Sequence, residues 1–353
     1  MKILEKYDLK YLNTFAVSVR AKFFIQIESE SELKELFTLP EFQQNKKIFL
    51  GSGSNVLFTK DFDGIVVLNK LKGIEILEDN SETVVIKCMS GEVWHDLVNF
   101  AVERGYWGIE NLSFIPGTVG AAPMQNIGAY GAELKNVLES VESFEITTGK
   151  ENKKRIFSKE ECELGYRDSV FKNKFKDQYF IVSITLKLSK IEKKNISYKI
   201  LQEYLEKNKI EVKNSKDVSE AVMAIRKSKL PDPNEIGNVG SFFKNIFVGK
   251  EKLKELLKIY PTMPHFEEGE GTSPQPSPYK GEGEVKIPAA WLIEQCGWKG
   301  QRIGRVGVHD RQALVIVNHG GATGEEIKNL AEQIITSVQD KFSLTLVPEV
   351  NIV

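Results

Sequence analysis

Two glycine-rich segments set among short β-type runs restrict the fold of this chain more than any other feature. The first is GSGSN at residues 51–55, and the second is IPGTVGAAPMQNIGAYGAE at residues 115–133. Successive small residues let backbone N–H groups converge on an anion without obstruction by side chains. Neither segment contains the G-K-[ST] of a P-loop or the G-x-G-x-x-G that opens a Rossmann helix. Each alone is equally typical of tight turns, but together they favour a large phosphate-bearing ligand lying along the backbone.

Hydrophobic periodicity predicts an α+β chain. Short β-type runs punctuated by glycine fill the first half, and DQYFIVSITLKL at 177–188 is a strong strand signal. Helical spacing of apolar residues covers 93–108 and 219–230, and the second of these helices is halted by the PDP that follows it. Helices and strands alternate through the rest of the second half. The pattern is typical of a β-rich first half joined to a compact mixed second half.

Composition places the chain among ordinary globular proteins. Its 353 residues are enough for two or three domains, and its net charge of −1 gives no overall attraction to nucleic acid or to an anionic membrane. Cys88, Cys162 and Cys296 are far apart and form no C-x-x-C, which argues against a disulfide framework and against a metal site. The N-terminus has no apolar signal region, and no uncharged run approaches the ~20 residues of a membrane span. We expect a cytoplasmic monomer.

One segment stands apart in composition. Residues 267–284 read EEGEGTSPQPSPYKGEGE, which has hardly an apolar anchor. Such a stretch cannot bury enough surface to offset the entropy lost on ordering it. We therefore predict a flexible, solvent-exposed insertion, with a functional lid as the alternative.

Three polar residues occupy positions that invite a chemical explanation. Ser241 lies in GNVGSFFKN, where the following Phe242 and Phe243 do not fit the G-x-S-x-G elbow of a serine nucleophile. Glu349 lies in the apolar run LVPEVNIV, where a carboxylate is costly to bury without a cationic partner or a catalytic task. Arg167 lies in GYRDSVFK, and an isolated arginine there is by default a surface charge.

Taken in order, five motifs resemble those of the UDP-N-acetylenolpyruvoylglucosamine reductase family of bacterial flavoenzymes. They are FLGSGSN, the 115–133 segment, GYRDSVFK, KLPDPNEIGNVGSFFKN and the closing PEV, and the likeness spans nearly the whole chain. SYKIL around Tyr198 is similar to the longer type of the family, which carries a tyrosine-bearing loop. The resemblance implies a two-lobed FAD-binding domain of the vanillyl-alcohol-oxidase type plus a smaller α+β substrate-binding domain. The implied ranges are 1–69 with 343–353 (lobe 1), 70–218 (lobe 2) and 219–342 (substrate-binding domain).

The resemblance also implies which residues hold the cofactor. The two glycine-rich segments would bind FAD, and because they contain no His or Cys we expect non-covalent binding. The implied cofactor-binding residues are Gly51, Ser52, Gly53, Ser54, Asn55, Ile115, Pro116, Gly117, Thr118, Gly120, Ala121, Gln125, Asn126, Gly128, Ala129 and Tyr130.

The implied reaction uses NADPH as co-substrate and a nucleotide-sugar enolpyruvyl ether as substrate. Reduced FAD would deliver a hydride to the vinyl carbon, and charge would develop on the adjacent carbon and its carboxylate. Arg167 matches the carboxylate-binding arginine, Glu349 a second group that acts when protonated, and Ser241 the proton donor. The implied substrate-binding residues are Tyr198, Lys229, Asn245, Lys299 and Gln312.

Three departures from the family pattern concern the substrate side. Ile246 stands where a proline is common, Phe266 where a tyrosine is frequent, and Asn351 where an arginine is frequent. We expect them to affect affinity and not the type of reaction. Two alternatives remain open from the sequence: an FAD-dependent alcohol oxidase of the same fold, and a nucleotide-sugar-binding protein without catalysis.

Overall fold

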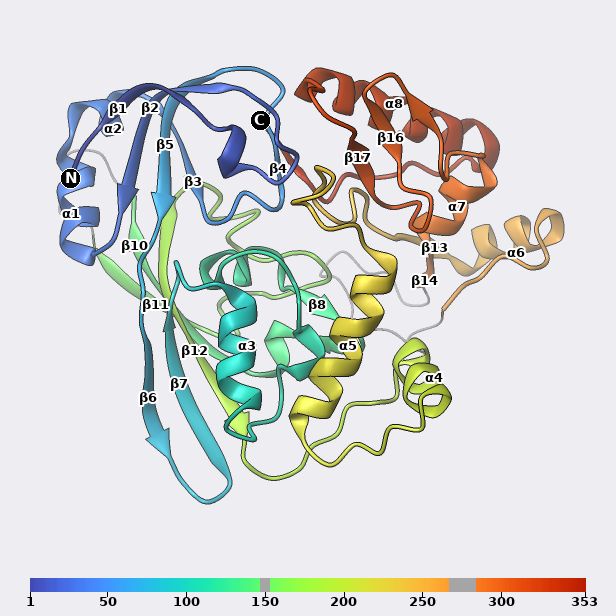
Figure 1. Ribbon diagram of the computed structural model, residues 1–353, viewed down its shortest axis with the longest axis horizontal. Helices are drawn as coiled ribbons and strands as arrows, with labels where there is room; N and C mark the ends of the chain where they lie inside the picture. Colours follow the sequence, from blue (N-terminus) through green and yellow to red (C-terminus); the bar gives the residue numbers. More distant parts are fainter. Residues whose placement is uncertain (147–152, 267–283) are drawn as a thin grey trace.

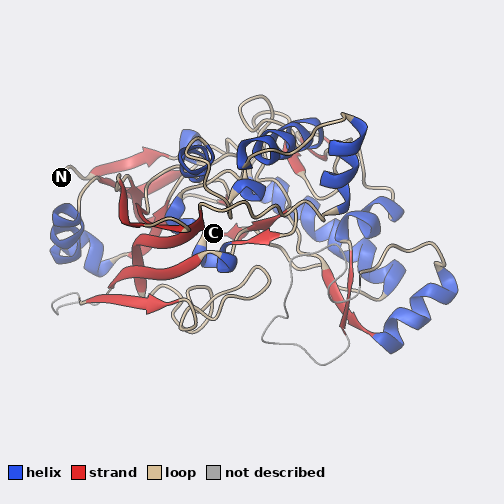
Figure 2. Cartoon of the chain, turned by 90° about the horizontal axis from the view of Figure 1, so that it is seen from below, coloured by secondary structure: helices blue, strands red, loops and turns tan. Residues whose placement is uncertain are grey.

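The computed structural model describes residues 1–146, 153–266 and 284–353. An N-terminal sheet, a central sheet with its covering helices and a C-terminal group of helices and short strands make up the molecule (Figure 1). Seen from below, most strands gather on one side and most helices on the other (Figure 2). The predicted α+β class is confirmed.

The N-terminal sheet has the strand order β1-β2-β5-β3, with β2, β5 and β3 parallel and β1 antiparallel. Its elements are β1 (Leu4–Asp8), β2 (Arg20–Ile27), β5 (Phe62–Asn69), β3 (Lys46–Leu50), α1 (Glu30–Thr38) and α2 (Pro40–Gln44). Ile65 and Val67 of β5 pack in the core with α1 and α2, and Val66 and Leu68 pack in the core shared with the C-terminal part. Burial on both faces explains why this strand reads as a continuous apolar run.

The central sheet is antiparallel throughout, in the order β11-β10-β12-β7-β6. Its strands are β6 (Ile74–Asp79), β7 (Thr83–Met89), β10 (Leu138–Glu145), β11 (Lys154–Ser158) and β12 (Tyr179–Ser189). Helix α3 (Trp94–Val102) buries Leu97, Val98 and Ala101 in the same core as the sheet. The helix predicted over 93–108 is therefore confirmed but ends six residues earlier, ahead of Gly105 at φ +73°.

Short elements within and beside the 115–133 segment, together with two helices, complete the central part. They are η2 (Glu110–Leu112), η3 (Val119–Ala121), η4 (Pro123–Gln125), β8 (Gly128–Ala129), β9 (Ala132–Glu133), η5 (Leu134–Asn136), α4 (Lys199–Lys207) and α5 (Ser215–Lys229). Asn214 caps α5 by accepting a hydrogen bond from the Asp217 N–H. The buried face of α5 packs with α4 and Trp107 in one small core. The predicted domain boundary at residue 219 falls inside α5, and the predicted division into ranges stays a prediction.

The C-terminal part contains a long helix on short strands. Its elements are β13 (Ile246–Gly249), α6 (Lys250–Ile259), β14 (Glu284–Ile287), α7 (Ala289–Gln295), β15 (Arg302–Ile303), β16 (Val306–Val308), β17 (Ile316–Asn318) and α8 (Gly324–Phe342). After α8 the chain returns to the N-terminal part, where β18 (Asn351–Ile352) pairs in parallel with β4 (Val56–Leu57). This return brings Glu349 to the first glycine-rich segment.

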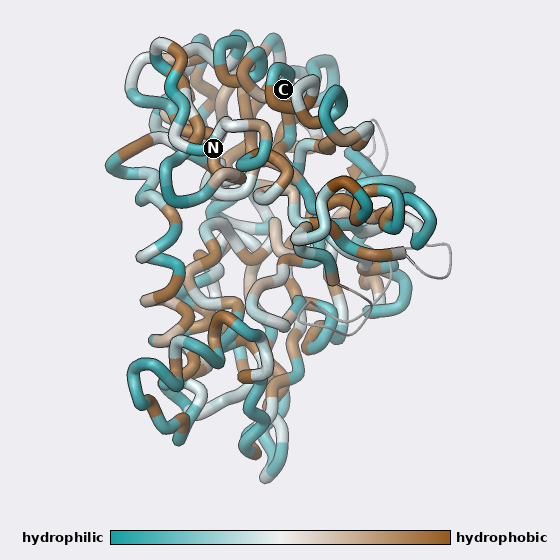
Figure 3. Tube along the Cα trace, turned by 90° about the vertical axis from the view of Figure 1, so that its right-hand side faces the viewer, coloured by the Kyte–Doolittle hydropathy of each residue, from teal (hydrophilic) through white to brown (hydrophobic). Residues whose placement is uncertain are grey.

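The sequence also predicted no membrane-spanning helix and an insertion at residues 267–284. In the described residues no helix combines the length and the apolar character that a membrane crossing needs, and the trace in Figure 3 alternates between hydrophobic and hydrophilic stretches. The predicted insertion at 267–284 lies outside the described residues except for Glu284, which begins β14.

Candidate active site

Arg167 and Glu349, which are 182 positions apart in the chain (349 − 167), form a largely buried ion pair. The distance from Arg167 Nε to Glu349 Oε1 is 3.1 Å, and the two side chains are 21% and 13% exposed. Arg167 also donates from Nη2 to the Gly128 carbonyl at 2.8 Å, and its backbone is in the left-handed region at φ +53°. Burial has the largest single effect and lowers the pKa of Arg167, but the contacts with Glu349, Tyr166 and Glu133 together outweigh it, so the pKa is raised. Arg167 is thus no surface charge.

Both glycine-rich segments reach this ion pair through their amide side chains. Gln125 donates from Nε2 to Glu349 Oε1 at 3.2 Å. Asn55 donates from Nδ2 to Gln125 Oε1 at 3.1 Å and to the Glu349 carbonyl at 3.4 Å. No described residue contacts Glu349 Oε2 by a hydrogen bond or ion pair, so this oxygen is open to a ligand.

Ser241 is joined to Glu349 through the backbone of its neighbour. Phe242 accepts a hydrogen bond from the Glu349 N–H at 2.8 Å and donates its own N–H to the Leu314 carbonyl at 2.8 Å. Ser241 itself forms a β-bridge with Val315. Phe242 and Phe243 are fully buried, whereas Ser241 is half-buried, and its hydroxyl has no hydrogen-bond partner among the described residues. The hydroxyl is therefore free to act on a ligand.

The two glycine-rich segments lie face to face. A Cβ added to Gly51 would lie 2.1 Å from Thr118 Oγ1, and one added to Gly117, at φ +129°, would lie 3.3 Å from Ser54 Oγ. Within the described residues the backbone N–H groups of 52–54 have no acceptor. Three unpaired backbone donors in succession are an arrangement that an anion could satisfy, and we refer to the two facing segments as the cradle.

Two further predicted cofactor residues, Asn126 and Tyr130, have their side chains engaged within the protein. Asn126 is fully buried at φ +44°, and its amide is bonded to Glu133 Oε2, the Gly165 carbonyl and the Lys135 N–H. Any contact of Asn126 with a cofactor would therefore come from its backbone. Tyr130 lies against Tyr198, with ring centroids 5.5 Å apart in an edge-on arrangement.

The predicted substrate residues fall into two groups. Asn245 donates to the Tyr166 hydroxyl at 3.2 Å and accepts from the Ala289 N–H at 3.1 Å, which places it beside Arg167. Gln312 precedes the Leu314–Val315 turn that contacts the Ser241 segment, and Lys229 lies in the last turn of α5. Lys299 is exposed and pairs with Glu294 at 2.9 Å, and none of its contacts in the described residues joins it to the others.

Three lysines lie near Arg167: Lys244, which follows Ser241 in the GNVGSFFKN motif, and Lys172 and Lys286, which the sequence did not mark as site residues. Lys244 donates to the Arg167 carbonyl at 3.3 Å, and Lys172 donates to Gln125 Oε1 at 3.4 Å. Burial and, to a smaller extent, the positive charge of Arg167 lower the pKa of Lys286 to about 8, against the opposing effect of Glu133. The sequence does hold one indication of Lys286, because this lysine lies between Val285 and Ile287, which are both buried in a short strand. The site thus carries an excess of positive charge, which suits an anionic ligand.

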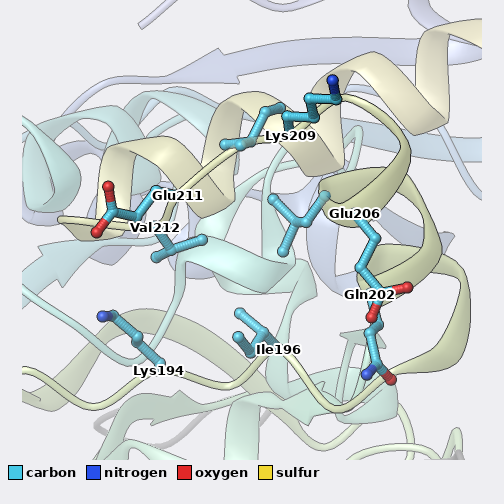
Figure 4. A pocket seen from close by; sticks show the side chains of 9 residues that line it. Lys194, Ile196, Gln202, Glu206, Lys209, Glu211 and Val212 are labelled. Atoms are coloured by element: carbon cyan, nitrogen blue, oxygen red, sulfur yellow. The ribbon is translucent and has the colours of Figure 1, made fainter.

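A cavity of ≈ 490 Å³ lies elsewhere, between the 194–196 segment, α4 and the chain that leads to α5 (Figure 4). Ile196, Leu205 and Val212 form its apolar wall, and Lys194 and Glu211 stand at its rim. None of the predicted site residues lines it.

The chain matches two family models and is similar over its whole length to several named proteins. Residues 232–353 match the family model described as UDP-N-acetylenolpyruvoylglucosamine reductase, C-terminal domain, and residues 21–153 match a model described as FAD binding domain. Proteins named UDP-N-acetylenolpyruvoylglucosamine reductase from Flavobacterium johnsoniae and Amoebophilus asiaticus are 44% and 46% identical, each over 100% of both chains.

Two solved structures share the fold. The UDP-N-acetylenolpyruvylglucosamine reductase of Thermus caldophilus superposes with a TM-score of 0.65 at 21% identity, covering 99% of this chain and 98% of that one. A solvent-stable cholesterol oxidase superposes with a TM-score of 0.53 at 10% identity, covering 99% and 86%. The predicted two-lobed FAD-binding fold is confirmed.

Proposed function

The chain belongs to the UDP-N-acetylenolpyruvoylglucosamine reductase family, and on that premise we propose how its residues carry out the reaction. It is an FAD-dependent oxidoreductase that reduces UDP-N-acetylenolpyruvoylglucosamine in peptidoglycan synthesis, as expected from the sequence. Our proposal adds NADPH as the electron source, UDP-N-acetylmuramate as the product, non-covalent FAD, and a monomer that works in the cytoplasm.

The two facing glycine-rich segments fit the cofactor. The unpaired N–H groups of 52–54 would bind its pyrophosphate, and the 115–121 stretch opposite, kept close by Gly51 and Gly117, would hold the remainder. Bound FAD would supply hydride-transfer chemistry between NADPH and the vinyl methylene carbon of the substrate. All other steps belong to side chains of this protein.

Arg167 binds the substrate carboxylate. Its guanidinium is held by Gly128 and Glu349, and its planar fork retains N–H groups for a second carboxylate. Because it is largely buried, its charge acts at low local dielectric on the electrons that move toward the substrate carboxylate. Lys172, Lys244 and Lys286 add positive charge around it and favour the anionic substrate.

Glu349 acts from the other side of the same carboxylate. Its Oε1 is occupied by Arg167 and Gln125, and its Oε2 is open. With a proton on Oε2, Glu349 donates a hydrogen bond to the substrate and draws electron density from the vinyl group. Glu349 is a carboxylate in its ion pair with Arg167, so this role requires it to take up a proton when the substrate carboxylate binds to Arg167.

Ser241 completes the reaction. After hydride addition, a carbanion remains on the carbon next to the carboxylate, and the Ser241 hydroxyl gives it a proton. The new C–H bond uses the carbanion's electron pair, the O–H bond breaks, and the serine oxygen regains its proton from water. The phenylalanines that follow are fully buried and keep the back of this segment dry.

The observation that carries the proposal is the convergence of Arg167, Glu349 and the Ser241 segment, which are linked by an ion pair and by a backbone hydrogen bond between Glu349 and Phe242. Its test is anaerobic reduction of the flavin by NADPH, followed by addition of the enolpyruvyl nucleotide. We expect the substrate alone to reoxidise the flavin. A requirement for oxygen, or turnover of an alcohol, would instead identify an alcohol oxidase. Protein that cannot be loaded with FAD would point to a binding protein without catalysis.

Substitution of Gly51 by alanine is expected to weaken FAD binding about tenfold to a hundredfold. The added Cβ would lie 2.1 Å from Thr118 Oγ1 and would force the two cradle segments apart, and such overpacking costs about 1–3 kcal/mol. Fluorescence titration of the apoprotein with FAD measures the effect. Gly249→Ala is the matched control, because a Cβ there meets nothing within 4 Å. Equal affinity of both variants would contradict the placement of the cradle.

Substrate binding is expected to weaken as the pH rises through the pKa of Lys286, which lies at about 8. Above this pH the ammonium loses its proton, so one positive charge disappears from the site and KM rises by up to about tenfold per pH unit. Lys286→Arg keeps its charge at these pH values, and its KM should stay flat. The measurement is KM for the enolpyruvyl nucleotide against pH in both proteins. The same rise in the arginine variant would assign the titration to another group.

A further inference from the structure

Asn238 is a buried amide three residues before Ser241, and the three hydrogen bonds of its side chain all go to the segment that leads to this serine. It is 2% exposed. Its Nδ2 donates to the Pro231 carbonyl at 3.2 Å and to the Ile236 carbonyl at 2.9 Å, and its Oδ1 accepts from the Gly240 N–H at 2.9 Å. Gly240 has φ +72°, a conformation that only glycine adopts at little cost. The side chain of Asn238 therefore holds the turn from which Ser241 emerges.

The backbone of Asn238 ties the same turn to the cofactor cradle. Its N–H donates to the Thr14 carbonyl at 2.9 Å, and the Thr14 N–H donates to the Gly53 carbonyl at 3.1 Å. One residue of the N-terminal segment thus bridges Gly53 of the cradle and the Ser241 turn. In Figure 1 the chain that follows α5 runs up toward β4 and β17.

Asn318 makes a second connection between the N-terminal segment and the start of this turn. It is 3% exposed, donates from Nδ2 to the Phe15 carbonyl at 2.8 Å, and donates its backbone N–H to the Gly237 carbonyl at 2.8 Å. A Cβ on Gly237 would lie 2.4 Å from the Phe15 carbonyl oxygen, so the backbones of these two segments are in close contact. The turn is therefore clamped at residue 237 and again at residue 240.

We propose that Asn238 is a positioning residue that sets the Ser241 hydroxyl in register with the cofactor cradle, through its bond to Gly240 and its backbone link to Thr14. The inference rests on the proposed role of Ser241 as proton donor. A proton donor must stand within hydrogen-bond reach of the carbon that receives the proton, and a displacement of about 1 Å reduces the rate of such a step about a hundredfold. Asn238 touches neither substrate nor cofactor and acts only through the turn.

The test compares Asn238→Ala with Asn238→Asp in the FAD-loaded enzyme. Alanine removes all three bonds, and kcat is expected to fall about a hundredfold while KM stays within about twofold. Aspartate keeps the acceptor for the Gly240 N–H, and kcat should recover to within about tenfold of the wild type. In the alanine variant, NADPH should still reduce the flavin at the wild-type rate. Reoxidation by the enolpyruvyl nucleotide should be slow and show a larger solvent deuterium isotope effect, because proton transfer has become limiting.

Ile334→Ala in the buried face of α8 is the control for general destabilisation. It lowers the melting temperature but should leave the isotope effect unchanged. If Asn238→Ala loses both half-reactions equally, or if aspartate is as slow as alanine, the positioning role is wrong. The proposed function fails in a different way, namely when the wild-type flavin is not reoxidised by the nucleotide at all.

Discussion

Replacement of Ser241 by alanine is expected to leave flavin reduction by NADPH intact and to slow product formation by about 10²–10⁴-fold, the range that a positioned general acid contributes. The hydroxyl has no partner in the described residues, so its removal leaves no protein group unpaired and the fold should be unaffected. Stopped-flow measurement of the two half-reactions separates the effects. The substituted enzyme should still be reduced by NADPH, but it should lack the proton donor that completes the second half-reaction.

Ser337→Ala is a suitable control for this experiment. Its hydroxyl bonds only to the Gln333 carbonyl one turn earlier in α8, and both half-reactions should proceed at wild-type rates. Equal loss of the two half-reactions in Ser241→Ala would show that Ser241 serves the cofactor site or the fold and not protonation.

Replacement of Arg167 by lysine is expected to lower kcat/KM for the enolpyruvyl nucleotide by about 10²–10³-fold, as for the loss of one preorganised donor at a centre of developing charge. Lysine keeps the charge but has no planar fork, so it cannot bond Gly128, Glu349 and a substrate carboxylate in the geometry of arginine. Steady-state kinetics measures the loss. The guanidinium contacts the second glycine-rich segment at the Gly128 carbonyl, so FAD content is measured alongside and reports any effect on the cofactor site.

The matched control is Arg155→Lys in β11. Arg155 is also an arginine paired with a glutamate, at 3.1 Å from Glu161, and its guanidinium stacks on Phe157 outside the site. Activity should be retained there. Wild-type kcat/KM in Arg167→Lys would show that the substrate carboxylate binds elsewhere.

These predictions separate the parts of the proposed mechanism. The substitution of Gly51 tests cofactor binding, and those of Arg167 and Lys286 test binding of the charged substrate. The substitutions of Ser241 and Asn238 test proton transfer. The last two should share one phenotype, with normal flavin reduction and slow reoxidation. They should differ in degree, because Asn238→Ala displaces the donor and Ser241→Ala removes it.

Much of the fold was predictable from local pattern. The strand at 177–188 and the helices at 93–108 and 219–230 were found within a few residues, because burial of one face imposes its period on the sequence. The approach of the two glycine-rich segments to one another agrees with their composition, since close backbone contact needs glycine and small residues. Their binding of an anion stays a prediction from residue types.

The sequence by itself therefore determined the elements, the two glycine-rich segments and the three chemically unusual residues Arg167, Ser241 and Glu349. Only the tertiary structure decided that Arg167 and Glu349 are partners, that Gln125 bonds to Glu349, and that Lys286 joins them. The reason is physical: periodicity and turn chemistry act over a few neighbouring residues, whereas these contacts join positions more than a hundred residues apart. Such contacts depend on the return of the last strand to β4 and on how the sheets pack, which no local pattern encodes.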